Sequence, residues 1–139
     1  CACGEAGDRR PQGALARQDD RYHTVPYRYG FLNGLAFGPD STSKWHMIDH
    51  QTGKVRSYDP GPGVALSELC FAPRRKGAAE ADGYIVGVAS NQRENGRADL
   101  LILDTQDISA GPIAIVRLPY RVPAQVHGFW VPGHELPAA

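Results

Sequence analysis

The sequence lacks several features that mark common classes of protein. Its only cysteines are Cys1, Cys3 and Cys70, an odd and badly spaced set that excludes a disulfide framework or a four-ligand zinc site. We therefore expect a reducing compartment, the cytoplasm. Its only methionine is Met47, so residue 1 is not an ordinary translation start. We expect a fragment or a processed chain, and a mature lipoprotein beginning at Cys1 is a further alternative.

Excess charge and long apolar runs are also missing. The 15 basic and 15 acidic residues cancel, so no long-range field attracts nucleic acid or an anionic membrane. The longest apolar stretches are "YIVGVA" (84–89) and "LLIL" (100–103), far short of the roughly 20 residues that cross a bilayer. We expect neither a nucleic-acid partner nor a transmembrane segment.

Short apolar segments separated by glycine and proline fill the rest of the chain. The stretch "SKWHMIDHQTGKVRSYD" (43–59) predicts a hairpin around a turn at Gln51–Gly53. Further strands are expected in "ELCFAP" (68–73), "GYIVGVAS" (83–90), "DLLILDT" (99–105), "PIAIVRLP" (112–119) and "QVHGFWVP" (125–132). Roughly seven or eight short strands without a convincing helix predict an all-β antiparallel meander. Periodicity alone leaves a sandwich, a barrel or propeller blades open.

The five histidines are the candidate metal ligands: His23, His46, His50, His127 and His134. On a helix, His46 and His50 would be neighbours, but four residues of strand span about 13 Å, too far to share one ion. His127 lies between apolar segments and is expected in a largely buried strand. There a neutral imidazole needs hydrogen-bond partners or a metal. The residues alone leave both open, and one histidine cannot make a metal site.

Several stretches in a fixed order resemble the C-terminal end of the carotenoid cleavage oxygenases. They are "DDRYHTVPYRYGF" (19–31), "DHQTGKVRSYDPGPG" (49–63), "SELCFAPR" (67–74), "DGYIVGVASN" (82–91), "ADLLILDTQDISAGPIAIVRLPYRVP" (98–123) and "VHGFWVP" (126–132). The family includes apocarotenoid oxygenases, lignostilbene dioxygenases and the retinal pigment epithelium isomerase. The resemblance covers residues 19–132.

This resemblance implies a seven-bladed β-propeller, present here only as its C-terminal blades, with a non-haem Fe(II) on its axis. Four histidines from separate blades would hold the iron, and the last of them matches His127. Glu68 in "SELCFAP" matches a carboxylate that accepts a hydrogen bond from the other ring nitrogen of a ligand and so fixes its tautomer. Phe31, Phe129 and Trp130 are candidate cavity-lining residues, with core packing as the plainer alternative.

The sequence also departs from the family's pattern. Ala14 stands where an acidic residue is expected, and three iron histidines would lie upstream of anything present here. We therefore expect a disordered leader at 1–18, propeller from 19 to 132 and a tail at 133–139.

The function implied is that of a C-terminal fragment of an Fe(II) dioxygenase. The parent would cleave an apolar conjugated alkene of apocarotenoid or stilbene type with O2 to two carbonyl products, and the fragment would be inactive alone. The alternative is a non-catalytic β-sheet binding or interaction module derived from the same scaffold.

Overall fold

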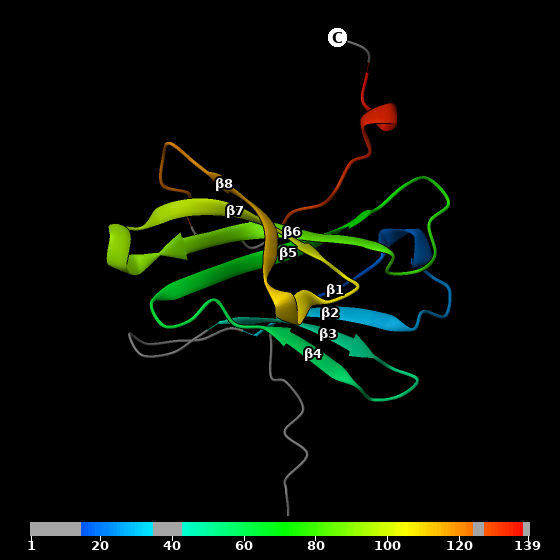
Figure 1. Ribbon diagram of the computed structural model, residues 1–139. Helices are drawn as coiled ribbons and strands as arrows, with labels where there is room; N and C mark the ends of the chain where they lie inside the picture. The colour runs from blue at the N-terminus through cyan, green and yellow to red at the C-terminus, as the bar shows by residue number, and fades with distance from the viewer. Residues whose placement is uncertain (1–14, 35–42, 124–126, 138–139) are drawn as a thin grey trace, which may run out of the picture.

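The computed structural model describes residues 15–34, 43–123 and 127–137, which form two antiparallel sheets of four strands each (Figure 1). The first sheet contains β1 (Leu15–Gln18), β2 (Tyr29–Gly34), β3 (Lys44–Asp49) and β4 (Val55–Tyr58). The second contains β5 (Val64–Pro73), β6 (Gly83–Asn91), β7 (Arg97–Asp104) and β8 (Pro112–Arg117). Strands that follow one another in the chain also pair in each sheet. The all-β antiparallel meander predicted from the sequence is confirmed.

Two turns between strands have glycine or asparagine at a position with positive φ. Between β3 and β4, Gly53 has a φ of 72°, and the Asp49 carboxylate accepts a hydrogen bond from the Gln51 amide at 3.0 Å. Between β6 and β7, the 3-10 helix η2 (Gln92–Glu94) ends at Asn95, with a left-handed φ of 57°. The first of these hairpins was expected at Gln51–Gly53, and both turns place at their positive φ a residue type, glycine or asparagine, that adopts it more readily than others.

The hydrophobic core lies between the two sheets. From the first sheet Phe31 and Trp45 are fully buried, and from the second Leu69, Ile85 and Leu103 are as well. Phe31 stacks on Phe71 of β5, with ring centroids 5.5 Å apart, so its role is core packing. Burial of each large apolar side chain stabilises the fold by about 1.5–3 kcal/mol.

Gly87 in β6 lies directly against Trp45 of the facing sheet. A Cβ atom added there would lie 2.6 Å from the indole of Trp45, so only glycine fits against this ring. The indole Nε1 of Trp45 donates a hydrogen bond to the Ser67 carbonyl of β5 at 2.9 Å. Trp45, the largest fully buried side chain of the described residues, therefore connects the two sheets.

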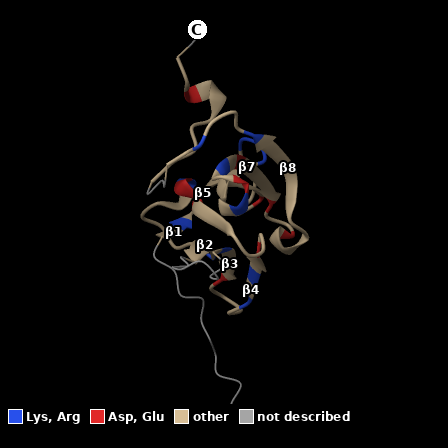
Figure 2. Ribbon diagram, turned by 90° about the vertical axis from the view of Figure 1, so that its left-hand side faces the viewer, with Lys and Arg blue, Asp and Glu red and all other residues tan. Residues whose placement is uncertain are grey.

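Three further 3-10 helices complete the described chain: η1 (Asp20–Tyr22), η3 (Ile108–Ala110) and η4 (Gly133–Glu135). No helix in the described part is long and apolar enough to cross a bilayer. The segment 127–137 starts beside β5 and then rises away from both sheets in two perpendicular views (Figures 1 and 2). Basic and acidic positions are interspersed along the ribbon (Figure 2), as expected for a chain without net charge.

Two expectations about the ends of the described chain are wrong. Residues 15–18 were assigned to a disordered leader but form β1, which pairs with β2 from Leu15↔Asn33 to Gln18↔Gly30. Residues 1–14 lie outside the described part. The segment "QVHGFWVP" was expected to be a strand, yet 127–132 contain none. The Gly128 amide and carbonyl instead hydrogen-bond to the side chains of Glu68 and Arg17, which takes the place of a strand partner.

Candidate functional site

Glu68 lies at an irregular point of β5 and is almost fully buried. The pairing of β5 with β6 shifts register between Leu66 and Leu69, and such bulges redirect side chains. The side chain of Glu68 is only 4% exposed. A carboxylate removed from water in this way needs charged or hydrogen-bonding partners.

Four polar contacts satisfy the Glu68 carboxylate. Arg17 Nε donates to Oε1 at 3.0 Å and Arg17 Nη2 to Oε2 at 2.8 Å, a bidentate pair. The Gly128 amide donates to Oε2 at 2.8 Å, and His127 Nδ1 lies 3.3 Å from Oε1. Burial raises the pKa of Glu68, but the hydrogen bonds from Arg17, Gly128 and His127 outweigh it and lower the pKa below its usual value. Glu68 is therefore ionised at neutral pH.

His127 turns one ring nitrogen toward Glu68. Because an ionised carboxylate only accepts hydrogen bonds, the contact requires a proton on Nδ1 and leaves the Nε2 lone pair free in the neutral ring. Metal-bound histidines commonly use this arrangement. The expectation that His127 is largely buried is wrong, since its side chain is 73% exposed. The backbone of the next residue, Gly128, is held by the side chains of Arg17 and Glu68, and residues 127–132 form no strand.

The other histidines lie apart from this contact. His46 Nδ1 is 2.7 Å from Ser57 Oγ, His23 contacts Asp20, His134 faces Glu135, and His50 packs against the Tyr27 ring. Within 15–34, 43–123 and 127–137 no three His, Cys, Asp or Glu side chains gather as a metal site would require. His127 can supply one imidazole ligand. A metal ion bound to it would need its remaining ligands from outside the described residues.

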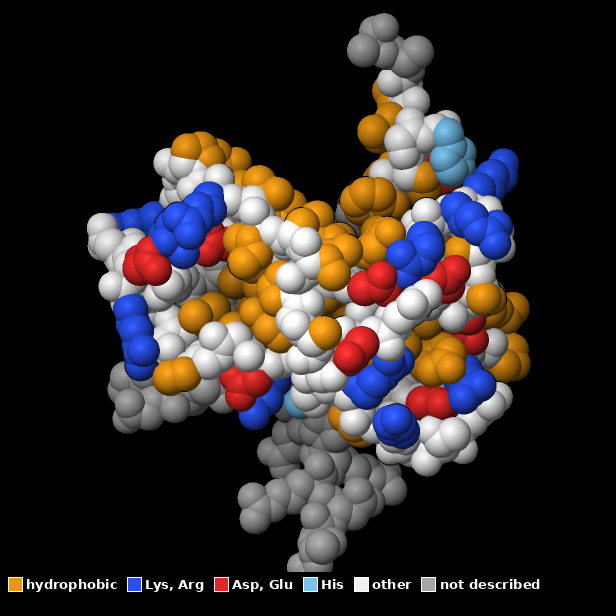
Figure 3. Space-filling view, viewed as in Figure 1, with side chains coloured by type: hydrophobic (Ala, Val, Ile, Leu, Met, Phe, Trp, Pro, Cys, Tyr) orange, Lys and Arg blue, Asp and Glu red, His pale blue; other side chains and the backbone are white. Residues whose placement is uncertain are grey.

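A small cavity adjoins Glu68 and His127. It measures about 160 Å³ and is lined by Glu68, Cys70, Val88, His127, Phe129 and Trp130, among others. Phe129 is 75% exposed and Trp130 44%. Both aromatic side chains border this cavity from the C-terminal segment. Because they are exposed, neither belongs to the core. Figure 3 shows further apolar side chains exposed around the notch beneath this segment.

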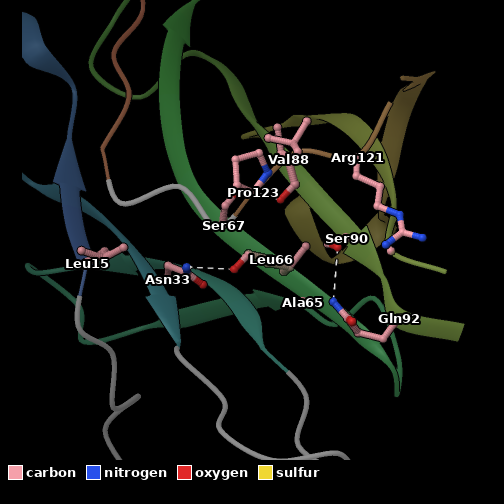
Figure 4. A pocket seen from close by; sticks show the side chains of 12 residues that line it. Leu15, Asn33, Ala65, Leu66, Ser67, Val88, Ser90, Gln92, Arg121 and Pro123 are labelled. Carbon is pink, nitrogen blue, oxygen red and sulfur yellow. Dashed lines mark hydrogen bonds between the residues drawn. The ribbon is translucent and has the colours of Figure 1, made fainter. Parts of the chain in front are cut away.

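A larger cavity of about 560 Å³ contains neither Glu68 nor His127 (Figure 4). Its lining includes Leu15, Asn33, Leu66, Val88 and Pro123. The Asn33 carboxamide donates to the Leu66 carbonyl at 3.2 Å, and its Oδ1 has no hydrogen-bond partner within the described chain. The larger cavity therefore contains the carboxamide of Asn33, whereas the smaller one contains the carboxylate of Glu68 and the imidazole of His127.

Arg17 is the site residue that sequence reasoning missed. It lies on β1, inside the segment assigned to a leader, and the four residues of this strand show no alternating apolar pattern. Its partner Glu68 is 51 positions away, and an ion pair across such a separation leaves no local signal. The arginine could have been recognised only once β1 was placed beside β5.

Comparison with known proteins identifies the family. The family model described as RPE65, retinal pigment epithelial membrane protein, matches residues 8–132. This match starts within the segment 1–18 that we expected to lack resemblance, so the boundary at residue 19 was placed too late. A lignostilbene-α,β-dioxygenase isozyme III from Sphingomonas paucimobilis is 38% identical over 136 residues, covering 88% of this chain and 27% of its own length.

Two further comparisons agree. An isoeugenol monooxygenase from Pseudomonas nitroreducens is 44% identical over 127 residues, covering 82% of this chain and 26% of its own length. The crystal structure of Pseudomonas brassicacearum lignostilbene dioxygenase superposes with a TM-score of 0.77 at 33% identity, over 85% of this chain and 27% of that one. The chain thus spans about a quarter of the length of these relatives.

The match over most of the chain and the shared arrangement of strands lead to one conclusion. The two four-stranded sheets correspond to part of the seven-bladed propeller, and the chain belongs to the carotenoid cleavage oxygenase (RPE65) family.

Proposed function

We propose that this chain is the C-terminal part of a non-haem Fe(II) oxygenase that uses O2 to cleave a carbon–carbon double bond conjugated to an aromatic ring or a polyene. The observation that carries the proposal is the Glu68 carboxylate, which contacts both His127 Nδ1 and the Gly128 amide. The names of the lignostilbene and isoeugenol relatives support an aryl-conjugated alkene as the substrate class.

In this proposal each residue has a defined task. His127 offers Nε2 as one iron ligand, and Glu68 accepts the Nδ1 proton, which fixes the ring's tautomer and raises its basicity. Phe129 and Trp130 offer apolar surface beside the ligand, suited to an alkene and to excluding water. The iron, when bound, would supply the redox chemistry with O2.

The test joins this chain to the upstream part of the Pseudomonas brassicacearum lignostilbene dioxygenase, in place of the quarter that it matches. We expect the chimera to retain iron and to cleave a stilbene to two aldehydes. His127→Ala should abolish both, because it removes a ligand. His134→Ala is the matched control, since this exposed histidine lies on the same segment and contacts Glu135 instead of Glu68.

Each other outcome has a defined meaning. If the chimera folds but retains no iron, the proposal fails and the non-catalytic module is favoured. If His127→Ala keeps iron and turnover, His127 is not a ligand. The 139-residue chain alone should hold no stoichiometric iron, because a single imidazole competes poorly with water for a labile divalent ion.

A further inference from the structure

Arg17 connects the first sheet to the His127 segment. Its guanidinium contacts both Glu68 oxygens, and Nη2 also donates to the Gly128 carbonyl at 2.5 Å. Gly128 is 111 positions away from it in the chain. One side chain from β1 therefore reaches β5 and the residue that follows His127.

These contacts leave the carboxylate little freedom to rotate. Oε1 is shared by Arg17 and His127, while Oε2 is shared by Arg17 and the Gly128 amide. A planar guanidinium that grips both oxygens fixes the plane of the carboxylate, which a lysine cannot do. Gly128 is held at its amide by Glu68 and at its carbonyl by Arg17. The backbone next to His127 and the acceptor of its Nδ1 proton are thus fixed together.

We propose that Arg17 is a positioning residue that sets the orientation and the tautomer of His127 through Glu68 and the Gly128 carbonyl. In water a neutral histidine carries its proton mainly on Nε2. Holding it on Nδ1 requires an acceptor at a fixed place, and Arg17 keeps Glu68 in that place. The consequence for metal binding rests on the function proposed above, whereas the consequence for the tautomer does not.

The direct test measures the tautomer in the 139-residue chain labelled with 15N at histidine. Long-range 1H–15N correlation at a pH where the imidazole is neutral distinguishes Nδ1–H from Nε2–H. We expect Nδ1–H for the native chain and a shift toward Nε2–H in Arg17→Ala and Arg17→Lys. Exchange of the Gly128 amide should accelerate by roughly 10-fold or more in both variants, because a hydrogen bond to a charged group is lost or misaligned.

Arg97→Ala is the matched control. Arg97 is another arginine on a strand that pairs with a carboxylate, Asp99, and it does not contact Glu68 or His127. It should leave the His127 tautomer unchanged. If Arg17→Ala proves unable to fold, Arg17→Lys decides, since it keeps the charge and most of the length. A native tautomer and native Gly128 exchange in Arg17→Lys would overturn the proposal.

Metal affinity gives the second readout, in the chimera with the lignostilbene dioxygenase. Arg17→Ala should lower its affinity for Fe(II) by roughly 10- to 100-fold, the usual effect of disturbing the support of a metal-bound histidine. An unchanged affinity would overturn the link between Arg17 and the metal. A chimera that binds no iron even with Arg17 present would contradict the proposed function while leaving the tautomer result in the isolated chain intact.

Discussion

Strand β5 and the C-terminal segment 127–137 meet at one carboxylate, yet they are held in place in different ways. β5 pairs with β6 on both sides of the irregularity between Leu66 and Leu69, and it buries Leu66, Leu69 and Phe71 in the core. The segment 127–137 has no strand, and its apolar residues Phe129, Trp130 and Leu136 are 75%, 44% and 56% exposed. Apolar burial positions the strand, whereas hydrogen bonds to Glu68 and Arg17 position the segment.

Because of this difference, one set of contacts determines the free energy of unfolding and another determines the position of His127. Burial of apolar surface gives a large free energy but little direction. A bidentate ion pair gives a defined direction and a modest free energy. Changes in the core should therefore alter global unfolding, and changes around Glu68 should displace His127 while both sheets stay folded.

Trp45→Ala is expected to have the largest effect. It removes the fully buried indole that contacts Gly87 and Ser67 across the sheet interface. Large-to-small changes of this kind cost about 3–5 kcal/mol, and urea unfolding measures the loss. Trp45→Phe, which retains an aromatic ring, should cost clearly less. A loss below about 1 kcal/mol for Trp45→Ala would contradict the packing of the sheets on this residue.

Glu68→Ala should act mainly on the segment. It removes the acceptor of the Gly128 amide and leaves the Arg17 guanidinium, with a side chain only 24% exposed, without its carboxylate. We expect a cost of about 1–3 kcal/mol, seen as faster hydrogen exchange at Gly128 with little change in β6 and β7. Glu135→Ala, an exposed carboxylate on the same segment, should change neither. Equal acceleration throughout the sheets would mean that Glu68 supports the whole fold.

The sheets could be predicted from the sequence because their signals are local. β6 and β7 contain the short apolar runs "YIVGVA" and "LLIL" bounded by polar turn residues, and the Gln51–Gly53 turn defines the hairpin of β3 and β4. β1 was missed because it is short and without alternation, and its pairing with β2 comes from tertiary contact.

The site was predictable only in part. Glu68 and His127 were both named from family resemblance, and they lie in contact at 3.3 Å. Arg17 was not named, since a pair of charges 51 positions apart carries no pattern. The exposure of His127 was also missed, because an apolar neighbourhood in the sequence suggested a strand. The segment is held instead by hydrogen bonds between its backbone and the side chains of Glu68 and Arg17. Hydrophobic periodicity in a sequence does not predict such bonds.

Acidification should release the segment before it unfolds the sheets. The pKa of Glu68 is lowered: burial raises it, but hydrogen bonds from Arg17, Gly128 and His127 prevail. A lowered carboxyl pKa gives stabilisation that is complete above the unfolded value of 4.5 and is lost as the pH falls through the folded value. The effect should be smaller than that of Glu68→Ala, because a protonated carboxyl keeps part of its hydrogen bonding. The amide resonance of Gly128 should move below about pH 4.5 while core resonances stay in place. If the Gly128 and core resonances moved together, the segment would not be released before the sheets unfold.

Phe129→Ser should have the smallest effect on stability, although phenylalanine is among the largest apolar residues. Phe129 is 75% exposed, whereas Phe31 of the core is 1% exposed. Replacing an exposed residue usually changes the free energy of unfolding by less than about 0.5 kcal/mol, while Phe31→Ala should cost about 3–5 kcal/mol. Urea unfolding of both variants tests the contrast directly. If Phe129→Ser is neutral, a change in KM for a stilbene in the chimera reports on contact with substrate, since stability is then not the cause. A loss of more than about 1 kcal/mol would instead show that the aromatic ring helps to hold the segment, and that apolar packing positions His127 together with the hydrogen bonds to Glu68 and Arg17.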